Sequence, residues 1–248
     1  MSTALLAIAA RAPNTNEPCV VYCGSGGAGN YVKMVHNGIE YGDMQLIGEV
    51  FAMFKAKGME NAEIAAIFER WNSPDHALRS FLVEITSKVL LKEEMKVVLD
   101  KAGSKGTGKW TVQEAAQLGV PAPTVSAALE ARYVSSLKDL RVEAGTIPTN
   151  TDFLPDEDLE TMLSDALVCS KICSYAQGLS LICEAKKVHG WTDLQLTNVL
   201  DCWRGGCIIR AKLIGDFRAA VLDQTDDARF NLLAAPSIDS LLTDRQRN

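Results

Sequence analysis

The stretch that decides the fold is NYVKMVHNGIEYGDMQLIGEVFAMFKAK, residues 30–57. Its apolar residues recur at helical spacing, so it predicts one long helix. Val35 and Ile39 fall on one side of that helix, and Gly38 and Gly42 share this side. Because a glycine inside a helix costs about 1 kcal/mol relative to alanine, we expect another helix to approach closely at these two positions.

The opposite side of this helix is polar and suited to chemistry. It carries, at about 100° per residue, Lys33, His36, Asn37, Glu40, Tyr41 and Met44. Such a stripe is usually the solvated face of an amphipathic helix. The alternative is that it forms one wall of a site, and a repeat further along the chain bears on that choice.

Helical spacing continues through most of the chain, so we predict a mainly α protein. Thr111 and Glu114 have the spacing of a capping box, and Gly58 and Gly190 stand where helices should end. β-branched residues favour strands only at 19–22 and, more weakly, at 97–99. Further helices are expected at 61–71, 76–91, 111–118, 123–143, 156–189, 192–202 and 205–222.

Two segments repeat at a constant offset of 132 residues, GMENAEIAAIFERW (58–71) and GWTDLQLTNVLDCW (190–203). They predict two similar helical units, joined by the proline-bearing linker at 144–155. At the same offset the polar stripe falls on Asp165, Val168, Cys169 and Ile172. Since the second copy is largely apolar there, the fold itself does not require polar side chains, which favours a site on the first copy.

Composition excludes several classes of protein. With a net charge of −6 and a pI near 5.2, the chain lacks the basic field that nucleic acids and anionic membranes attract. No apolar run reaches the roughly 18 residues that membrane insertion needs. Seven cysteines without a Cys-x-x-Cys pair, and three distant histidines, predict reduced thiols and no metal site. We expect a cytoplasmic protein, with organelle targeting left open.

Two glycine-rich motifs match nucleotide-binding patterns only in part. Gly24, Gly26 and Gly29 have the dinucleotide spacing, but a helix follows where the second strand should stand. A simple turn into the helix is the better interpretation. The loop GSKGTGKW (103–110) has Trp110 in place of the hydroxyl that holds magnesium in a P-loop. It remains either an anion-binding loop before a helix or a solvated basic loop.

Five blocks identify a family when taken in order: GAGNYVKMVHNGIEYGDMQL (27–46), KAGSKGTGKWT (101–111), LEARYVSSLKD (129–139), SYAQG (174–178) and WRGGCIIRA (203–211). Together they resemble decarboxylating 6-phosphogluconate dehydrogenase, over about residues 5–230. The resemblance implies the all-helical C-terminal domain of that enzyme. In this family NADP takes a hydride from C3 of 6-phosphogluconate, carbon dioxide leaves, and the enediol is protonated to ribulose 5-phosphate without a metal.

The resemblance also implies roles for individual residues. Lys33 would accept the 3-hydroxyl proton and then assist decarboxylation, Glu40 would protonate C1, and Asn37 would orient the substrate as a third catalytic residue. Four more residues would bind substrate, the first at its hydroxyls or carboxylate and the others at its phosphate: His36, Tyr41, Lys105 and Arg132.

The resemblance divides the chain into three parts. Residues 1–29 would be the end of a coenzyme domain, with a short helix, a strand and a glycine-rich turn; 30–230 the substrate-binding and dimerisation domain; and 231–248 a divergent tail that holds Arg245 and Arg247. The family's coenzyme domain would precede residue 1. We therefore expect no NADP binding and no turnover from the chain alone, but assembly into a homodimer or larger complex. The alternative is a catalytically inactive helical subunit of such a complex.

Overall fold

The computed structural model describes residues 3–13, 15–145, 158–224 and 230–246. Within these ranges it is all helical, which confirms the predicted class, and β pairing is limited to two isolated bridges. The strands expected at 19–22 and 97–99 do not form. Neither segment has a neighbouring strand, and β-branched residues alone do not stabilise an unpaired strand.

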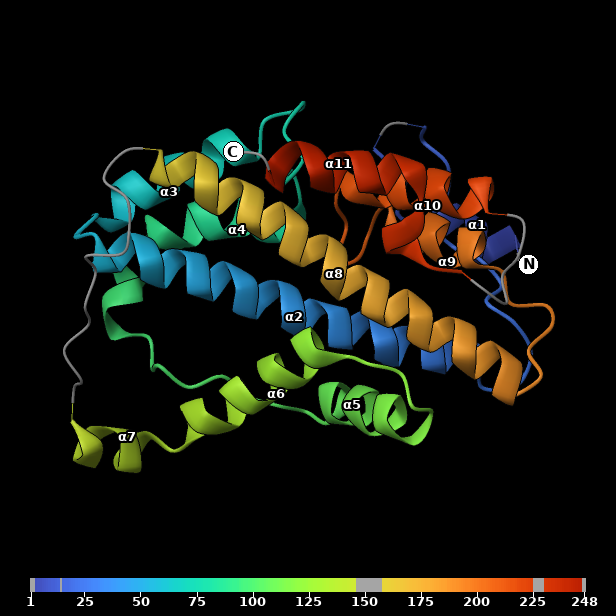
Figure 1. The fold of residues 1–248 in the computed structure, drawn as a ribbon, viewed down its shortest axis with the longest axis horizontal. Coiled ribbons are helices and arrows are strands. Elements are labelled where there is room, and N and C mark those ends of the chain that lie inside the picture. Colours follow the sequence, from blue (N-terminus) through green and yellow to red (C-terminus); the bar gives the residue numbers. More distant parts are fainter. Residues whose placement is uncertain (1–2, 14, 146–157, 225–229, 247–248) are drawn as a thin grey trace.

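The helices run in the following order (Figure 1): α1 (Thr3–Ile8), α2 (Ala28–Ala56), α3 (Asn61–Trp71), α4 (Phe81–Leu90), η1 (Glu93–Val97), α5 (Thr107–Gln117), α6 (Pro123–Ser136), α7 (Lys138–Ala144), α8 (Leu159–Val188), α9 (Leu196–Trp203), α10 (Leu213–Asp223), η3 (Leu232–Ala234) and α11 (Pro236–Gln246). The long helices α2 and α8 lie side by side and antiparallel through the middle of the molecule. Helices α5 and α6 lie on one side of this pair, and α9, α10 and α11 lie on the other.

Glycines set the close packing of α2, as its sequence predicts. A Cβ atom at Gly42 would lie 2.5 Å from Ser174 Oγ on α8, and one at Gly38 would lie 2.5 Å from Thr111 Cγ2 on α5. Both distances are shorter than real side chains allow. Only glycine therefore lets α8 and α5 approach α2 from two directions.

A buried ion pair also joins the two long helices. Lys171 Nζ on α8 lies 2.5 Å from Asp43 Oδ2 on α2, and the two side chains are 0% and 1% exposed. Burial raises the pKa of Asp43, while the Lys171 charge opposes that rise. One turn further along α8, the buried Tyr175 hydroxyl donates to the Ile209 carbonyl at 2.7 Å.

The element bounds agree with the predicted repeat. Shifted by 132 residues, α2 covers all but the first residue of α8, and α4 covers all but the last residue of α10. Gly42 and Ser174 occupy equivalent positions in the two units, so the two long helices contact each other at equivalent residues of the repeat. Trp71 and Trp203, which end α3 and α9, are both buried.

Two predicted helix starts are wrong because the N-cap residues lie elsewhere in the chain. Helix α5 begins at Thr107, with Gly106 as N-cap at φ +108°, so the capping box from Thr111 does not exist. Thr111 lies inside the helix and donates to Thr107 O. Helix α4 begins at Phe81 rather than near 76, because the Ser80 hydroxyl caps it by accepting from Val83 N.

Other expected boundaries also differ from the structure. The helix expected over 123–143 is divided into α6 and α7 at Leu137, the one expected at 192 begins at Leu196, and the one expected at 205 begins at Leu213. Gly58 and Gly190 do follow helix ends, with φ of +80° and +67°, as predicted. The linker lies outside the described residues from 146 onwards. Helix α11 falls in the tail, where no helix was expected.

Helix α8 is long and apolar enough to cross a membrane by length and composition alone, with a mean hydropathy of 1.3 over an 18-residue window. However, 67% of that window is buried inside the protein. A core helix of a globular domain passes the same test, and the contacts of α8 with α2, α6 and α11 are those of a core helix.

Candidate functional site

Three polar side chains from the stripe on α2 form a hydrogen-bonded cluster. Lys33 Nζ donates to Asn37 Oδ1 at 2.6 Å. His36 Nδ1 lies 3.2 Å from Lys33 Nζ and 3.0 Å from Asn37 Oδ1. Because Lys33 and Asn37 are four residues apart, the helix itself brings them together. The structure thus unites three of the residues that the sequence predicts.

His36 is the buried member of this cluster. Its side chain is 3% exposed, and its ring centroid lies 5.9 Å from that of Trp203 in a T-shaped arrangement. Its Nε2 atom has no hydrogen-bond partner among the described residues. Burial first, and the Lys33 charge second, lower the pKa of His36 to about 4. The ring is therefore neutral near pH 7, and its buried Nε2 can accept or donate a hydrogen bond according to its tautomer.

Helix α5 completes the cluster from the other side. Asn37 Nδ2 donates to Thr107 Oγ1 at 3.0 Å, and Thr111 Oγ1 donates to Met34 O at 2.9 Å. With both ends of its amide bonded, Asn37 has a fixed orientation. The sequence analysis missed Thr107 and Trp203, because their contacts join segments about 70 and 170 residues apart. The only signal for Thr107 was its place between two glycines in the loop.

Tyr41, which follows Glu40 on α2, forms a second group with Arg132 on α6. Tyr41 is buried, and the Arg132 guanidinium carbon lies 3.6 Å from its ring centroid. Arg132 also donates to Gly103 O at 2.7 Å. A Cβ atom at Gly108 would lie 2.4 Å from the Tyr41 ring, so glycine at this position makes room for the tyrosine.

Glu40 lies between the two groups in chain order and is half-buried. Burial raises its pKa, and the charges of Lys33 and Arg132 oppose that rise. Both cations therefore lie close enough to Glu40 to influence it. A carboxyl group with a raised pKa keeps its proton nearer to neutral pH and can act as a general acid.

Lys105 is exposed, and its side chain forms no hydrogen bond within the described residues. Its place in the chain nevertheless ties it to the site. Two residues before it, Gly103 O accepts from Arg132; two residues after it, Thr107 accepts from Asn37. The loop that carries Lys105 is therefore fixed at both ends to residues of the candidate site.

The described residues do not form a dinucleotide site at the glycine-rich turn. Asp193 Oδ1 accepts from Ser25 N at 3.2 Å, and Asp193 Oδ2 accepts from the Tyr22 hydroxyl at 3.1 Å. A carboxylate thus occupies the start of α2, where a pyrophosphate would bind in the fingerprint motif. This arrangement agrees with the interpretation of the segment as a structural turn.

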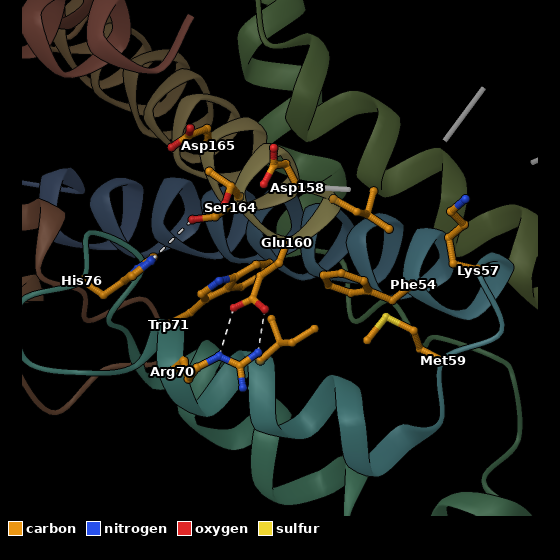
Figure 2. A pocket seen from close by; sticks show the side chains of 13 residues that line it. Phe54, Lys57, Met59, Arg70, Trp71, His76, Asp158, Glu160, Ser164 and Asp165 are labelled. Atoms are coloured by element: carbon orange, nitrogen blue, oxygen red, sulfur yellow. Dashed lines mark hydrogen bonds and ion pairs between the residues drawn. The ribbon is translucent and has the colours of Figure 1, made fainter. Parts of the chain in front are cut away.

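A cavity of about 840 Å³ lies elsewhere, between α3 and the start of α8 (Figure 2). Arg70 is held there by two hydrogen bonds to Glu160, at 3.1 and 2.6 Å, and Asp158 and Asp165 add negative charge. By the 132-residue offset, Asp165 stands where the first unit has Lys33. An anionic substrate therefore fits this cavity poorly.

Metal ligands do not gather in the part of the chain that the structure describes. No group of three or more His, Cys, Asp or Glu side chains is placed to hold an ion among those residues. None of the seven cysteines, all within the described residues, forms a disulfide, and burial raises the pKa of Cys23 and Cys207 to about 11. Such thiols stay protonated at neutral pH and react slowly.

Comparisons with known proteins agree with the sequence blocks and the fold. The family profile described as "6-phosphogluconate dehydrogenase, C-terminal domain" matches residues 29–248. "6-phosphogluconate dehydrogenase, decarboxylating 1" of Oryza sativa subsp. japonica is 46% identical over 98% of this chain, and the decarboxylating enzyme of Synechocystis is 43% identical over 98%. In each case the match covers 52% of the relative, so the chain spans about half the length of these proteins.

A solved structure gives the same result in three dimensions. Plasmodium falciparum 6-phosphogluconate dehydrogenase, studied without ligand, with its cofactor NADP+ and with its substrate 6-phosphogluconate, superposes with a TM-score of 0.87 at 39% identity. The superposition covers 94% of this chain and 52% of the other.

Proposed function

Since the chain belongs to the 6-phosphogluconate dehydrogenase family, through its match to the C-terminal domain, we propose that it supplies the substrate-binding and proton-transfer part of that enzyme. The whole reaction would be the NADP-dependent oxidative decarboxylation of 6-phosphogluconate to ribulose 5-phosphate in the pentose phosphate pathway. The observation that carries the proposal is the bonded cluster of Lys33, His36 and Asn37, with half-buried Glu40 one turn further along α2.

The chain's own residues would handle the protons of this reaction. As the hydride leaves C3, Lys33 Nζ would accept the 3-hydroxyl proton, which produces a β-keto acid. The same proton would return to the 3-oxygen as carbon dioxide leaves and the enediol forms. Glu40, whose pKa burial raises, would then donate a proton to C1 while the enediol hydroxyl that Lys33 protonated gives its proton back to Lys33, which leaves the ketone of ribulose 5-phosphate. Asn37, fixed between Lys33 and Thr107, would hold Lys33 in position for both transfers.

The substrate phosphate would bind at the far end of the site. Arg132 already lies against Tyr41, and its planar fork suits phosphate oxygens. Lys105, on the loop fixed by Gly103 and Thr107, would add a second cation. According to its tautomer, the neutral His36 ring would accept a hydrogen bond from a substrate hydroxyl or donate one to a hydroxyl or carboxylate.

NADP is the hydride acceptor in this proposal. It supplies the oxidant when bound, but the turn at Gly24 to Gly27 is occupied by Asp193 and does not fit its pyrophosphate. We therefore expect residues other than those described to hold it. For the chain as given we expect no measurable NADP affinity, and we place the protein in the cytoplasm.

Titration calorimetry with 6-phosphogluconate tests the substrate site on the chain itself. Each of Lys105→Ala and Arg132→Ala should weaken binding by about tenfold, since a hydrogen bond to a charged group is worth about 1.5–3 kcal/mol. The matched control is Lys92→Ala, which removes an equal charge away from the site. Unchanged affinity in both site variants would remove the phosphate assignment.

Turnover tests the catalytic assignment once a coenzyme domain is joined to the chain. Lys33→Met and Glu40→Gln should each lower kcat by about 10² to 10⁴-fold with an unchanged circular dichroism spectrum, as expected for a lost acid or base. Full activity in both variants would place the chemistry on another helix.

One observation favours assembly as well. Asp100 binds Lys138 and Arg141 of α7, so the segment with the exposed Val97 is tied to a helix whose Leu140 and Val142 are 59% and 66% exposed. An apolar surface of this kind commonly marks an interface, so we propose that a second copy of the chain covers it. Light scattering would support this if Val142→Glu converts a dimer to a monomer. An inactive assembly subunit would dimerise in the same way but would not bind 6-phosphogluconate.

A further inference from the structure

A second cavity, of about 630 Å³, lies between the start of α4, the end of α9 and α10. None of its lining residues belongs to α2, α5 or α6, which carry the candidate site. Two acidic residues line it, Glu17 and Glu84, against five cations: Arg79, Arg204, Arg210, Lys212 and Arg218. On a chain with a net charge of −6, this is a local excess of positive charge.

The backbone brings three of these cations together. Ser80 and Ala211 form an isolated antiparallel bridge, in which Phe81 N donates to Arg210 O at 3.1 Å and Lys212 N donates to Arg79 O at 2.9 Å. Residues on either side of a bridged position point to the same face. Accordingly, the Arg210 guanidinium carbon lies 3.7 Å from the Phe81 ring centroid.

In the part of the chain that the structure describes, these three cations form no direct ion pair with a carboxylate, although the charges of Arg79 and Arg210 act on Glu84 and that of Lys212 acts on Asp216. Arg210 donates to the carbonyl of Cys207 at 2.7 Å, and Lys212 donates to the carbonyl of Asp75 at 2.5 Å. Arg79 has no side-chain hydrogen bond or ion pair in the part of the chain that the structure describes. A hydrogen bond to a carbonyl oxygen satisfies the donor but does not neutralise the positive charge of the side chain.

The acids Asp201, Glu17 and Glu84 form ion pairs with cations other than these three. Asp201 binds both Arg204, at 3.2 Å, and Arg218, at 2.7 Å. Glu17 binds Arg204 at 3.0 Å. Glu84 pairs with Lys88, which is the main cause of its lowered pKa; the charges of Arg210 and Arg79 add to that effect without an ion pair.

We propose that this cavity binds a small polyanion of the phosphate class, such as a phosphorylated metabolite or a pyrophosphate, at a site separate from catalysis. Two guanidinium groups and an ammonium group supply the planar and point-charge donors that phosphate oxygens require. The cavity has the volume of a small-molecule site. Arg79 and Lys212 come from equivalent loops of the two helical units, so the ligand would bridge the units.

Calorimetry with inorganic pyrophosphate tests this proposal. It is best done in a Lys105→Ala, Arg132→Ala background, so that the proposed substrate phosphate site cannot contribute. There the double change Arg79→Gln with Lys212→Gln should weaken pyrophosphate binding by at least about tenfold. The control pair is Lys55→Gln with Lys92→Gln, which removes the same charge outside the cavity and should leave the affinity unchanged.

Each outcome decides the proposal. Saturable binding that only the cavity variant weakens would support it. Equal affinity in the cavity and control variants, or no saturable binding in the background protein, would overturn it. Arg79→Gln alone removes no hydrogen bond, so it keeps the test valid if the double variant unfolds, and it should still weaken binding. Cosedimentation with anionic phospholipid vesicles that the cavity variant abolishes would instead assign the cations to a membrane and overturn the soluble ligand.

Discussion

Replacing Lys171 by methionine tests how α2, the helix that carries the candidate site, is held in place. The substitution leaves Asp43, 1% exposed, as a buried carboxylate without its partner at 2.5 Å. Removing one member of a buried pair destabilises a protein by about 3–5 kcal/mol. We therefore expect Lys171→Met to lower the free energy of unfolding in urea by that amount, as followed by tryptophan fluorescence and circular dichroism.

Two controls separate this effect from a simple loss of charge. Glu160→Gln breaks the exposed pair with Arg70, whose side chain is 57% exposed, and should change the free energy of unfolding by about 0–1 kcal/mol. The double variant Asp43→Leu with Lys171→Met removes both buried charges and should recover most of the loss, since apolar replacements of buried pairs are often neutral. A loss below about 1 kcal/mol for Lys171→Met, or a double variant that loses the sum of both single losses, would refute the reasoning.

The pH dependence of Lys171→Met gives a further check on the same pair. Burial already raises the pKa of Asp43, and the Lys171 charge opposes the rise. Without Lys171 the folded pKa rises further, while the unfolded pKa stays ordinary. The folded variant then binds more protons than the unfolded chain, so its stability falls as the pH rises through that window. The decrease in the free energy of unfolding of Lys171→Met relative to the parent protein should accordingly be larger at pH 8 than at pH 5.

Two more predictions concern the candidate site. A Cβ atom at Gly108 would lie 2.4 Å from Tyr41, so Gly108→Ala should lower the free energy of unfolding by about 1–3 kcal/mol. The control is Gly48→Ala on α2, where the added Cβ meets open space and should raise the free energy of unfolding by about 0.5–1 kcal/mol. Equal effects of the two substitutions would contradict the packing argument. The pKa of His36 is lowered to about 4 from an unfolded value near 6.5, so the unfolded chain takes up a proton first as the pH falls. Stability should drop by about 3 kcal/mol between pH 6.5 and 4, and urea unfolding should find this drop reduced in His36→Gln.

Sequence alone was sufficient where structure follows from local spacing. The period of apolar residues placed α2, α3 and α8 within a few residues of their observed bounds. The same spacing brought Lys33 and Asn37 together, because a helix fixes residues four apart whatever surrounds it. The prediction that glycines on α2 mark close packing followed from their energetic cost and is confirmed by the contacts of Gly38 and Gly42.

The features that sequence analysis missed depend on contacts between residues far apart in the chain. Residues 205–212 have helix-compatible spacing, yet the bridge between Ser80 and Ala211 holds this segment out of a helix until Leu213. Thr107 reaches Asn37 across 70 residues, and no local pattern encodes that bond. The cations around Arg79 come from loops more than 100 residues apart, so no local pattern indicates that they share one cavity.

The equivalent helices α2 and α8 carry different kinds of residue at equivalent positions, so substitutions in them should have different effects. Where α2 exposes Lys33, α8 has Asp165, and where α2 buries His36, α8 buries Val168. Substitutions on the polar face of α2 should therefore lower activity in a protein that still folds, whereas substitutions at buried positions of α8 should lower the amount of folded protein. Buried positions of α2 such as Gly38 and Asp43 should behave like those of α8. In a set of variants, abundance and specific activity measured together should separate these two groups of positions.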